Sequence, residues 1–204
     1  MNFYFIFIIS AISIEFILAR ITGYLNITSL SPDLPEEFKN SYDESKYQNS
    51  QNYTRTNEKF DVVTGTFDFL FILCVIVFGL FNVLDVFVRS FGFQSDMING
   101  LIFFGLFMII QDILSTPFSL YRHFVVEERF GFNKMTMKTF VTDKIKGLFL
   151  MVLIGTPLLG IILYFFESFG DLAWLYAWAI VSGFILILQP LFTTFIAPLF
   201  NTFT

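Results

Sequence analysis

Two carboxylates within apolar stretches are the residues of this sequence best placed to do chemistry. Glu15 lies in the apolar run of residues 3–21, and Asp112 lies in the run of residues 97–120. A carboxylate in hydrocarbon costs ~3 kcal/mol or more, so each must face protein, water or the membrane surface. Two such groups can act as acid and base, or as a proton relay, if a fold brings them together. We expect Glu15 and Asp112 to line a polar cavity, and the sequence leaves their separation open.

Histidine and cysteine are too scarce in this chain for a metal site. His123 is the only histidine and Cys74 the only cysteine. A zinc site in a protein needs three or four ligands, several of them usually His or Cys. We therefore expect no metal cofactor within this chain, and a single cysteine excludes an intramolecular disulfide.

The elements that position these residues are long apolar helices. The chain has 204 residues, of which 55% are hydrophobic and 14% charged, whereas about a quarter of a soluble domain is charged. A helix needs about 20 residues to cross a bilayer. Five runs approach or exceed this length, at residues 3–21, 67–84, 97–120, 147–166 and 172–196. We predict an all-α fold, a polytopic membrane bundle of about five transmembrane helices within the lipid bilayer.

The first and second runs each raise a further question. No Lys or Arg precedes the first run, and residues 15–26 show no clear cleavage site, so we expect a retained helix rather than a signal peptide. Asp68 and Asp85 fall at opposite ends of the second run. We expect their side chains to reach the two membrane surfaces.

The distribution of basic residues predicts the orientation of the helices. Of the 12 Lys and Arg residues, all but Arg89 lie in or beside the first and third loops between the runs. Short loops rich in Lys and Arg stay in the cytoplasm, which places the N-terminus outside and Thr204 in the cytoplasm. The richness in Phe and Asn suggests an AT-rich bacterial genome, and we therefore expect the protein in a bacterial inner membrane. The net charge of -5 argues against a nucleic-acid partner.

The polar segment between the third and fourth runs carries a motif. It reads Glu127-Glu128-Arg129-Phe130-Gly131-Phe132-Asn133-Lys134, and Thr136, Phe140, Asp143 and Lys146 follow. Together with the Tyr53-Thr54 pair and the C-terminal Pro198-Leu-Phe-Asn201, it resembles the CAAX prenyl protease 1 family of membrane-embedded zinc endopeptidases. The motif candidates, in a structural or substrate-contacting role, are Glu127, Glu128, Arg129, Gly131, Phe132, Asn133, Asp143, Pro198 and Asn201.

The physical character of the motif favours a structural role over substrate contact. Gly131 between two phenylalanines suits a turn, and Asn133 can cap the element that follows. We expect these residues to shape the loop against the helix bundle.

The resemblance implies a protease that cuts beside a prenylated C-terminal cysteine, or clips other membrane-associated proteins. The family's histidine-glutamate-x-x-histidine helix and distant glutamate, which bind zinc and activate water, are missing here. We therefore expect residues 1–204 to be an N-terminal membrane domain that forms chamber wall and scaffold, with the zinc in a C-terminal catalytic domain. We also expect a fragment of a longer protein, because the chain stops within a family segment.

Two other classes of function stay open at this point. One is a noncatalytic membrane module that binds a lipidated or hydrophobic peptide, or a partner subunit that carries the catalytic half. The other is a small transporter with Glu15 and Asp112 in a proton relay.

Overall fold

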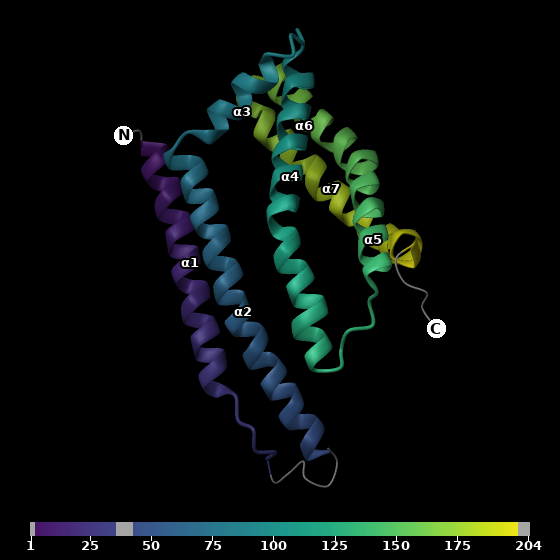
Figure 1. Cartoon of the computed structure of the whole chain (residues 1–204). Helices are drawn as coiled ribbons and strands as arrows, with labels where there is room; N and C mark the ends of the chain where they lie inside the picture. The colour runs from purple at the N-terminus through teal and green to yellow at the C-terminus, as the bar shows by residue number, and fades with distance from the viewer. Residues whose placement is uncertain (1–2, 36–42, 200–204) are drawn as a thin grey trace. The chain divides into compact units, whose positions relative to one another are not determined.

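All secondary structure in the described residues is helical. The computed structural model describes residues 3–35 and 43–199, and within them the chain forms α-, π- and 3-10 helices. Five helical segments are long and apolar enough to cross a membrane: Phe3–Ser29, Glu44–Val77, Asp96–Glu127, Met137–Ser168 and Gly170–Ile196 (Figure 1). This confirms the all-α class and the predicted number of spans.

The chain divides into two compact units, which we describe separately. Unit 1 comprises residues 1–84 and 110–134, and unit 2 comprises residues 85–109 and 135–204. The long helix α4 (Asp96–Tyr121) contributes its first half to unit 2 and its second half to unit 1.

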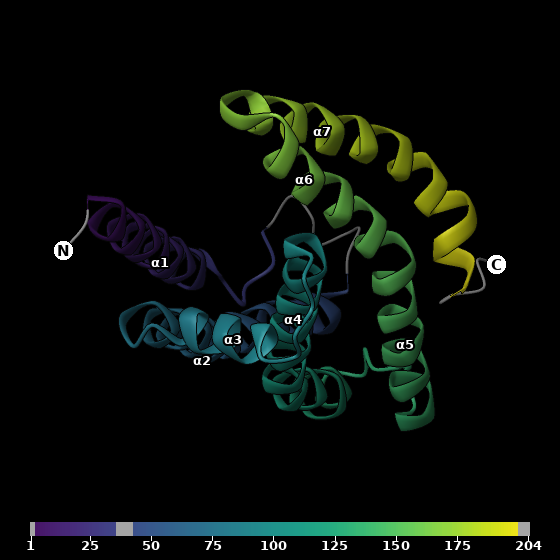
Figure 2. The same ribbon diagram turned by 90° about the horizontal axis from the view of Figure 1, so that it is seen from above.

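Unit 1 is built on the pairing of α1 (Phe3–Ser29) with α2 (Glu44–Val77), which run side by side in Figures 1 and 2. The rings of Phe16 and Phe69 stack between them, with centroids 4.3 Å apart. The second half of α4 continues as a π-helical turn, η2 (Arg122–Glu127), which contacts α2.

Helix α2 is longer than the apolar run predicts. Its 34 residues span ~51 Å at 1.5 Å per residue, whereas the hydrocarbon core is ~30 Å thick. Its polar N-terminal part therefore extends beyond the bilayer. Asp43 caps this end by accepting hydrogen bonds from the N–H groups of Ser45 (2.8 Å) and Lys46 (3.2 Å). The hydroxyl of Ser45 also donates to this carboxylate, and these bonds lower the pKa of Asp43.

The second apolar run is not one helix, so Asp68 and Asp85 do not lie at the two ends of the same helix, and the reach of their side chains to the membrane surfaces stays a prediction. Helix α2 ends at Val77, and Gly79 adopts φ 66°, which favours glycine, before α3 (Leu80–Arg89) begins. Asp68 lies nine residues before Val77, or ~14 Å along the helix, so it sits well inside the span. Asp85 belongs to α3.

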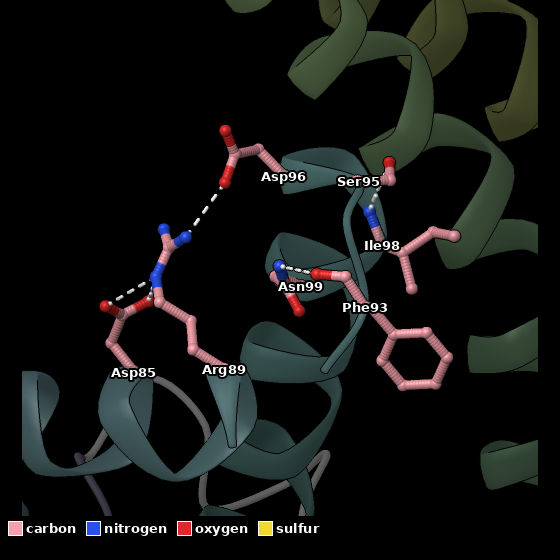
Figure 3. Close-up of polar contacts among 7 residues, drawn as sticks. All are labelled: Asp85, Arg89, Phe93, Ser95, Asp96, Ile98 and Asn99. Carbon is pink, nitrogen blue, oxygen red and sulfur yellow. Dashed lines mark hydrogen bonds and ion pairs between the residues drawn. The ribbon is translucent and has the colours of Figure 1, made fainter. Parts of the chain in front are cut away.

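A charged cluster fixes the turn from α3 into α4 within unit 2 (Figure 3). Arg89 bonds through Nε to Asp85 (3.0 Å) and through Nη1 to Asp96 (2.9 Å), which raises the pKa of Arg89. Asn99 is buried, and its Nδ2 donates to the carbonyl oxygen of Phe93 at 3.1 Å. The Arg89–Asp96 pair spans the turn and joins α3 to the start of α4, while the Asn99 hydrogen bond ties the turn itself to α4.

The rest of unit 2 is two long helical segments. The first joins α5 (Met137–Leu150), the π-turn η3 (Met151–Gly155) and α6 (Thr156–Ser168). After the short η4 (Gly170–Leu172), the second joins α7 (Ala173–Leu191), η5 (Phe192–Ile196) and η6 (Ala197–Leu199). Helices α6 and α7 pack together, with Tyr176 stacked on Phe165 at 5.6 Å (Figure 2).

Candidate functional site

Asp61 is the polar centre of unit 1, because it links three helical segments. Arg20 of α1 donates from Nη1 to the carbonyl oxygen of Asp61 on α2 at 2.9 Å. The guanidinium of Arg122, in η2, pairs with the Asp61 carboxylate. Each arginine also lies over an aromatic ring, Arg20 over Phe16 (5.4 Å) and Arg122 over Phe60 (5.2 Å). We call Arg20, Asp61 and Arg122 the Asp61 cluster.

A glycine makes room for this cluster. A Cβ atom on Gly65 would lie 2.8 Å from Nη2 of Arg20, so only glycine leaves space for the guanidinium in its present place. Six residues after Arg20 on α1, Asn26 donates from Nδ2 to Glu58 and ties the same two helices. The cluster was not predicted from the sequence, although opposite charges beside neighbouring apolar runs are a signal for such a contact.

A polar pocket of about 250 Å³ lies between α2 and the second half of α4. Asp68 lines it, and this carboxylate makes no hydrogen bond or ion pair with any residue that the structure describes. His123 also lines the pocket, and its Nδ1 lies 2.9 Å from Oε2 of Glu127. The other lining residues are Phe60, Thr64, Ser115, Phe118, Ser119 and Arg122. The hydroxyls and charged groups of this lining provide a polar environment for Asp68 within the span. Water can occupy such a pocket.

The two carboxylates that the sequence singled out lie in different surroundings. Glu15 is exposed on α1, in a groove of about 540 Å³. Asp112 is exposed on α4, where its carbonyl oxygen accepts hydrogen bonds from the hydroxyls of Ser115 (3.1 Å) and Thr116 (2.6 Å). Neither of these two cavities is lined by both carboxylates, so a proton relay between them gains no support.

The motif residues 127–134, which we call the motif loop, fold back on themselves at the end of η2. The carbonyl oxygen of Glu127 accepts hydrogen bonds from the N–H groups of Phe132 (2.9 Å) and Asn133 (3.3 Å). Gly131 has φ 74°, the left-handed conformation that the expected turn requires. Asn133 donates from Nδ2 to Glu128 at 2.9 Å, and Thr136, not Asn133, caps α5. The helix therefore begins three residues later than the expected cap would place it.

The motif loop contacts α2 at Tyr53, a member of the Tyr53-Thr54 pair that also carries the family resemblance. The ring of Tyr53 meets Phe130 at 5.5 Å and Phe132 at 4.6 Å, both edge to face. Asn49, one turn earlier on α2, donates from Nδ2 to the carbonyl oxygen of Phe130 at 3.3 Å. Segments that are far apart in the sequence thus form one aromatic contact, which the sequence did not reveal.

The remaining motif residues are dispersed. Arg129 lies over the ring of Phe130 at 5.8 Å, and Asp143 accepts a hydrogen bond from Lys146 at 3.3 Å within α5. Pro198 is in η6, and Asn201 lies outside the described residues.

The donor set of the described residues does not fit a zinc ion. Within residues 3–35 and 43–199, no group of three or more His, Cys, Asp or Glu side chains is placed to hold a metal. His123 is the only histidine in the sequence, and its Nδ1 is already engaged by Glu127.

Comparison with known proteins gives the family. The family described as "CAAX prenyl protease N-terminal, five membrane helices" matches residues 24–202, which is most of this chain. The chain belongs to this CAAX prenyl protease N-terminal family. It is an integral membrane protein, and the five spans of the structure agree with the family's five helices.

Its relatives are longer proteins. CAAX prenyl protease 1 of Saccharomyces cerevisiae is 34% identical over 194 residues, covering 88% of this chain and 41% of the relative. The CAAX prenyl protease 1 homolog of Arabidopsis thaliana is 31% identical over 194 residues, covering 89% and 45%. The crystal structure of S. mikatae Ste24p matches with a TM-score of 0.86 and 31% identity, covering 100% of this chain and 49% of that one. The chain therefore spans less than half the length of these relatives.

Tyr53→Ala is expected to loosen the motif loop of this CAAX prenyl protease N-terminal domain. Each aromatic pair contributes ~0.5–1.5 kcal/mol, and two pairs are lost. A loss of ~1.4 kcal/mol of contact energy shifts the equilibrium for local opening of the loop about tenfold. Trypsin cleavage after Arg129 and Lys134 should therefore accelerate by about tenfold. The control is Tyr47→Ala on the same helix, since Tyr47 makes no ring contact with the described residues. Equal cleavage rates in the two variants would contradict a role for Tyr53 in holding the loop.

Proposed function

We propose that this chain is the membrane-embedded half of a zinc metalloendopeptidase that cuts prenylated or other hydrophobic, membrane-associated peptides. The observation that supports this best is the family match over residues 24–202, together with the likeness of the whole chain to part of Ste24p. The lack of a zinc donor set in the described residues is consistent with this division of labour. The metal and its ligands belong to the part of the protein that this chain does not contain.

In this proposal the residues of the chain build a wall and do not react. Zinc bound by the C-terminal catalytic domain would polarise a water molecule for attack on the peptide carbonyl. The Asp61 cluster fixes α1, α2 and η2 relative to one another. The pocket with Asp68 and His123 keeps a polar, water-accessible surface within the wall. Such a wall excludes lipid and gives a hydrated peptide access to the interior of the membrane domain.

The proposed orientation places the N-terminus outside and the motif loop in the cytoplasm, because the basic residues flank that loop. In a Cys74→Ser background, cysteines placed at Ser45 and Ser168 should be labelled by an impermeant reagent from opposite sides. Labelling of both from one side would contradict the orientation. The relatives named above are all eukaryotic, so the bacterial membrane remains a prediction.

A cleavage assay on the full-length gene product tests the function. The purified protein with zinc should release the C-terminal tripeptide from a farnesylated peptide ending in a CAAX sequence, and residues 1–204 alone should not. The unprenylated peptide and the zinc-chelated enzyme are the controls. If the full-length protein cleaves neither the prenylated peptide nor a hydrophobic membrane-associated substrate, the proposal fails.

A further inference from the structure

Glu15 places a carboxylate without a partner among the described residues near the middle of a membrane helix. It lies 12 residues from Phe3 and 14 residues from Ser29, the two ends of α1. Its carboxylate forms no hydrogen bond or ion pair with any residue in the described part of the chain. Leaving such a group in hydrocarbon costs ~3 kcal/mol or more. The complete protein therefore has to supply a partner for it.

The surface around Glu15 has the shape of a helix-packing face. Ala11 and Ala19 lie one turn before and one turn after Glu15, so the backbone is accessible on both sides of the carboxylate. Ile14, Leu18 and Thr22 complete the lining of the groove, which we call the α1 groove. Small residues let two membrane helices approach closely, and polar side chains join them by hydrogen bonds.

Helix α2 cannot cover the α1 groove, because it occupies the other side of α1. Phe16 stacks on Phe69 of α2, and Arg20 bonds to Asp61 of the same helix. At 100° per residue, Leu18 points ~160° away from both Phe16 and Arg20. The groove thus faces away from α2, the helix that packs along α1.

Neither lipid nor a second copy fits the α1 groove well. Acyl chains offer no hydrogen-bond donor at this depth. A symmetric contact between two copies would bring the same patch of each chain together and set the two Glu15 carboxylates against each other, which is unfavourable for like charges.

We propose that the α1 groove packs against a membrane helix from the part of the protein that follows residue 204, and that this helix carries a hydrogen-bond donor or a basic side chain opposite Glu15. The relatives leave room for it, since this chain covers 49% of the Ste24p chain and 41% of the S. cerevisiae protein. This inference rests on the proposed function only in requiring the longer protein.

Site-specific photo-crosslinking in the full-length protein tests the inference. A benzophenone amino acid is placed at Leu18 in the groove or, as a matched control, at Ile17. The two side chains are equally exposed, at 56% and 54%, but differ by 100° around the helix. After illumination in membranes, mass spectrometry should find Leu18 joined to a peptide that follows residue 204 and Ile17 joined mainly to lipid. Leu18 joined only to lipid, to residues 1–204, or to a second copy would overturn the inference.

Substitutions of Glu15 test the partner's chemistry. Glu15→Gln should keep the Leu18 crosslink, because an amide still bonds to a donor. Glu15→Lys should lower its yield about tenfold or more, since a penalty of ~1.4 kcal/mol suffices for that. An unchanged yield in Glu15→Lys would refute a donor opposite Glu15. The crosslink is read without any cleavage assay, so an intact crosslink in a protein without peptidase activity would reject the proposed function alone.

Discussion

Gly100→Leu is expected to destabilise this domain by about 1–3 kcal/mol or more, because the new side chain has no space. A Cβ at position 100 of α4 would already lie 2.9 Å from Cδ1 of Leu163 on α6, and both residues belong to unit 2. Three further carbons would have to displace Leu163 and separate the two helices. The apparent melting temperature of the purified domain in detergent, followed by Trp fluorescence, should fall.

The matched control is Gly105→Leu on the same helix. A Cβ at Gly105 meets no described atom within 4 Å beyond its own helix, so leucine there faces open space. Replacement of a helical glycine should be neutral or stabilise by up to ~1 kcal/mol. A fall of equal size in both variants would contradict the contact with Leu163 as the cause of the destabilisation.

Asp61→Ala is the second large effect that we expect, a loss of about 1.5–3 kcal/mol. The substitution leaves the guanidinium of Arg122 without its carboxylate, while Arg20 keeps the backbone carbonyl at position 61. Fully buried pairs cost more to break, about 3–5 kcal/mol. The lower range applies because the side chains of Arg122 and Asp61 stay 36% and 45% exposed.

Two further variants separate charge from shape in the Asp61 cluster. Asp61→Asn keeps a hydrogen-bond acceptor for Arg122 and should lose about half as much stability as Asp61→Ala. Asp171→Ala changes an exposed aspartate with no bond to the described residues, and a change within ~0.5 kcal/mol is expected. Unfolding in graded sodium dodecyl sulfate measures all three. If Asp61→Ala falls within the Asp171→Ala range, the cluster does not hold unit 1 together.

The motif loop shows how much of the candidate site could be predicted. The turn at Gly131 follows from glycine between two phenylalanines, because its conformation is a local property. Its contact with Tyr53 could not be predicted, since the two are separated by most of α2 and α4. Asn133 was expected to cap α5, but Thr136 does so. Both residue types can cap a helix, and only the position of the helix start distinguishes them.

The polar residues within the spans show why the rest needed the tertiary structure. In a soluble helix, an apolar stripe predicts which face packs inwards. Helix α1 is apolar around most of its circumference, so the sequence does not say which side of it meets α2. Rotation by one residue moves a side chain by 100°. That rotation decides that Arg20 reaches Asp61 and that Glu15 faces away from α2.

By itself, the sequence determined the five helical spans, the all-α class and the absence of enough histidine and cysteine for a zinc site. A membrane span depends on the hydropathy of ~20 neighbouring residues, and possible zinc ligands can be counted in the sequence. Both predictions are therefore independent of the tertiary structure. Only the tertiary structure decided the break at Gly79, the link from Asp61 to both arginines, and the separate surroundings of Glu15 and Asp112. Contacts between helices depend on their rotation and pairing, and in a membrane an apolar surface faces lipid and protein alike.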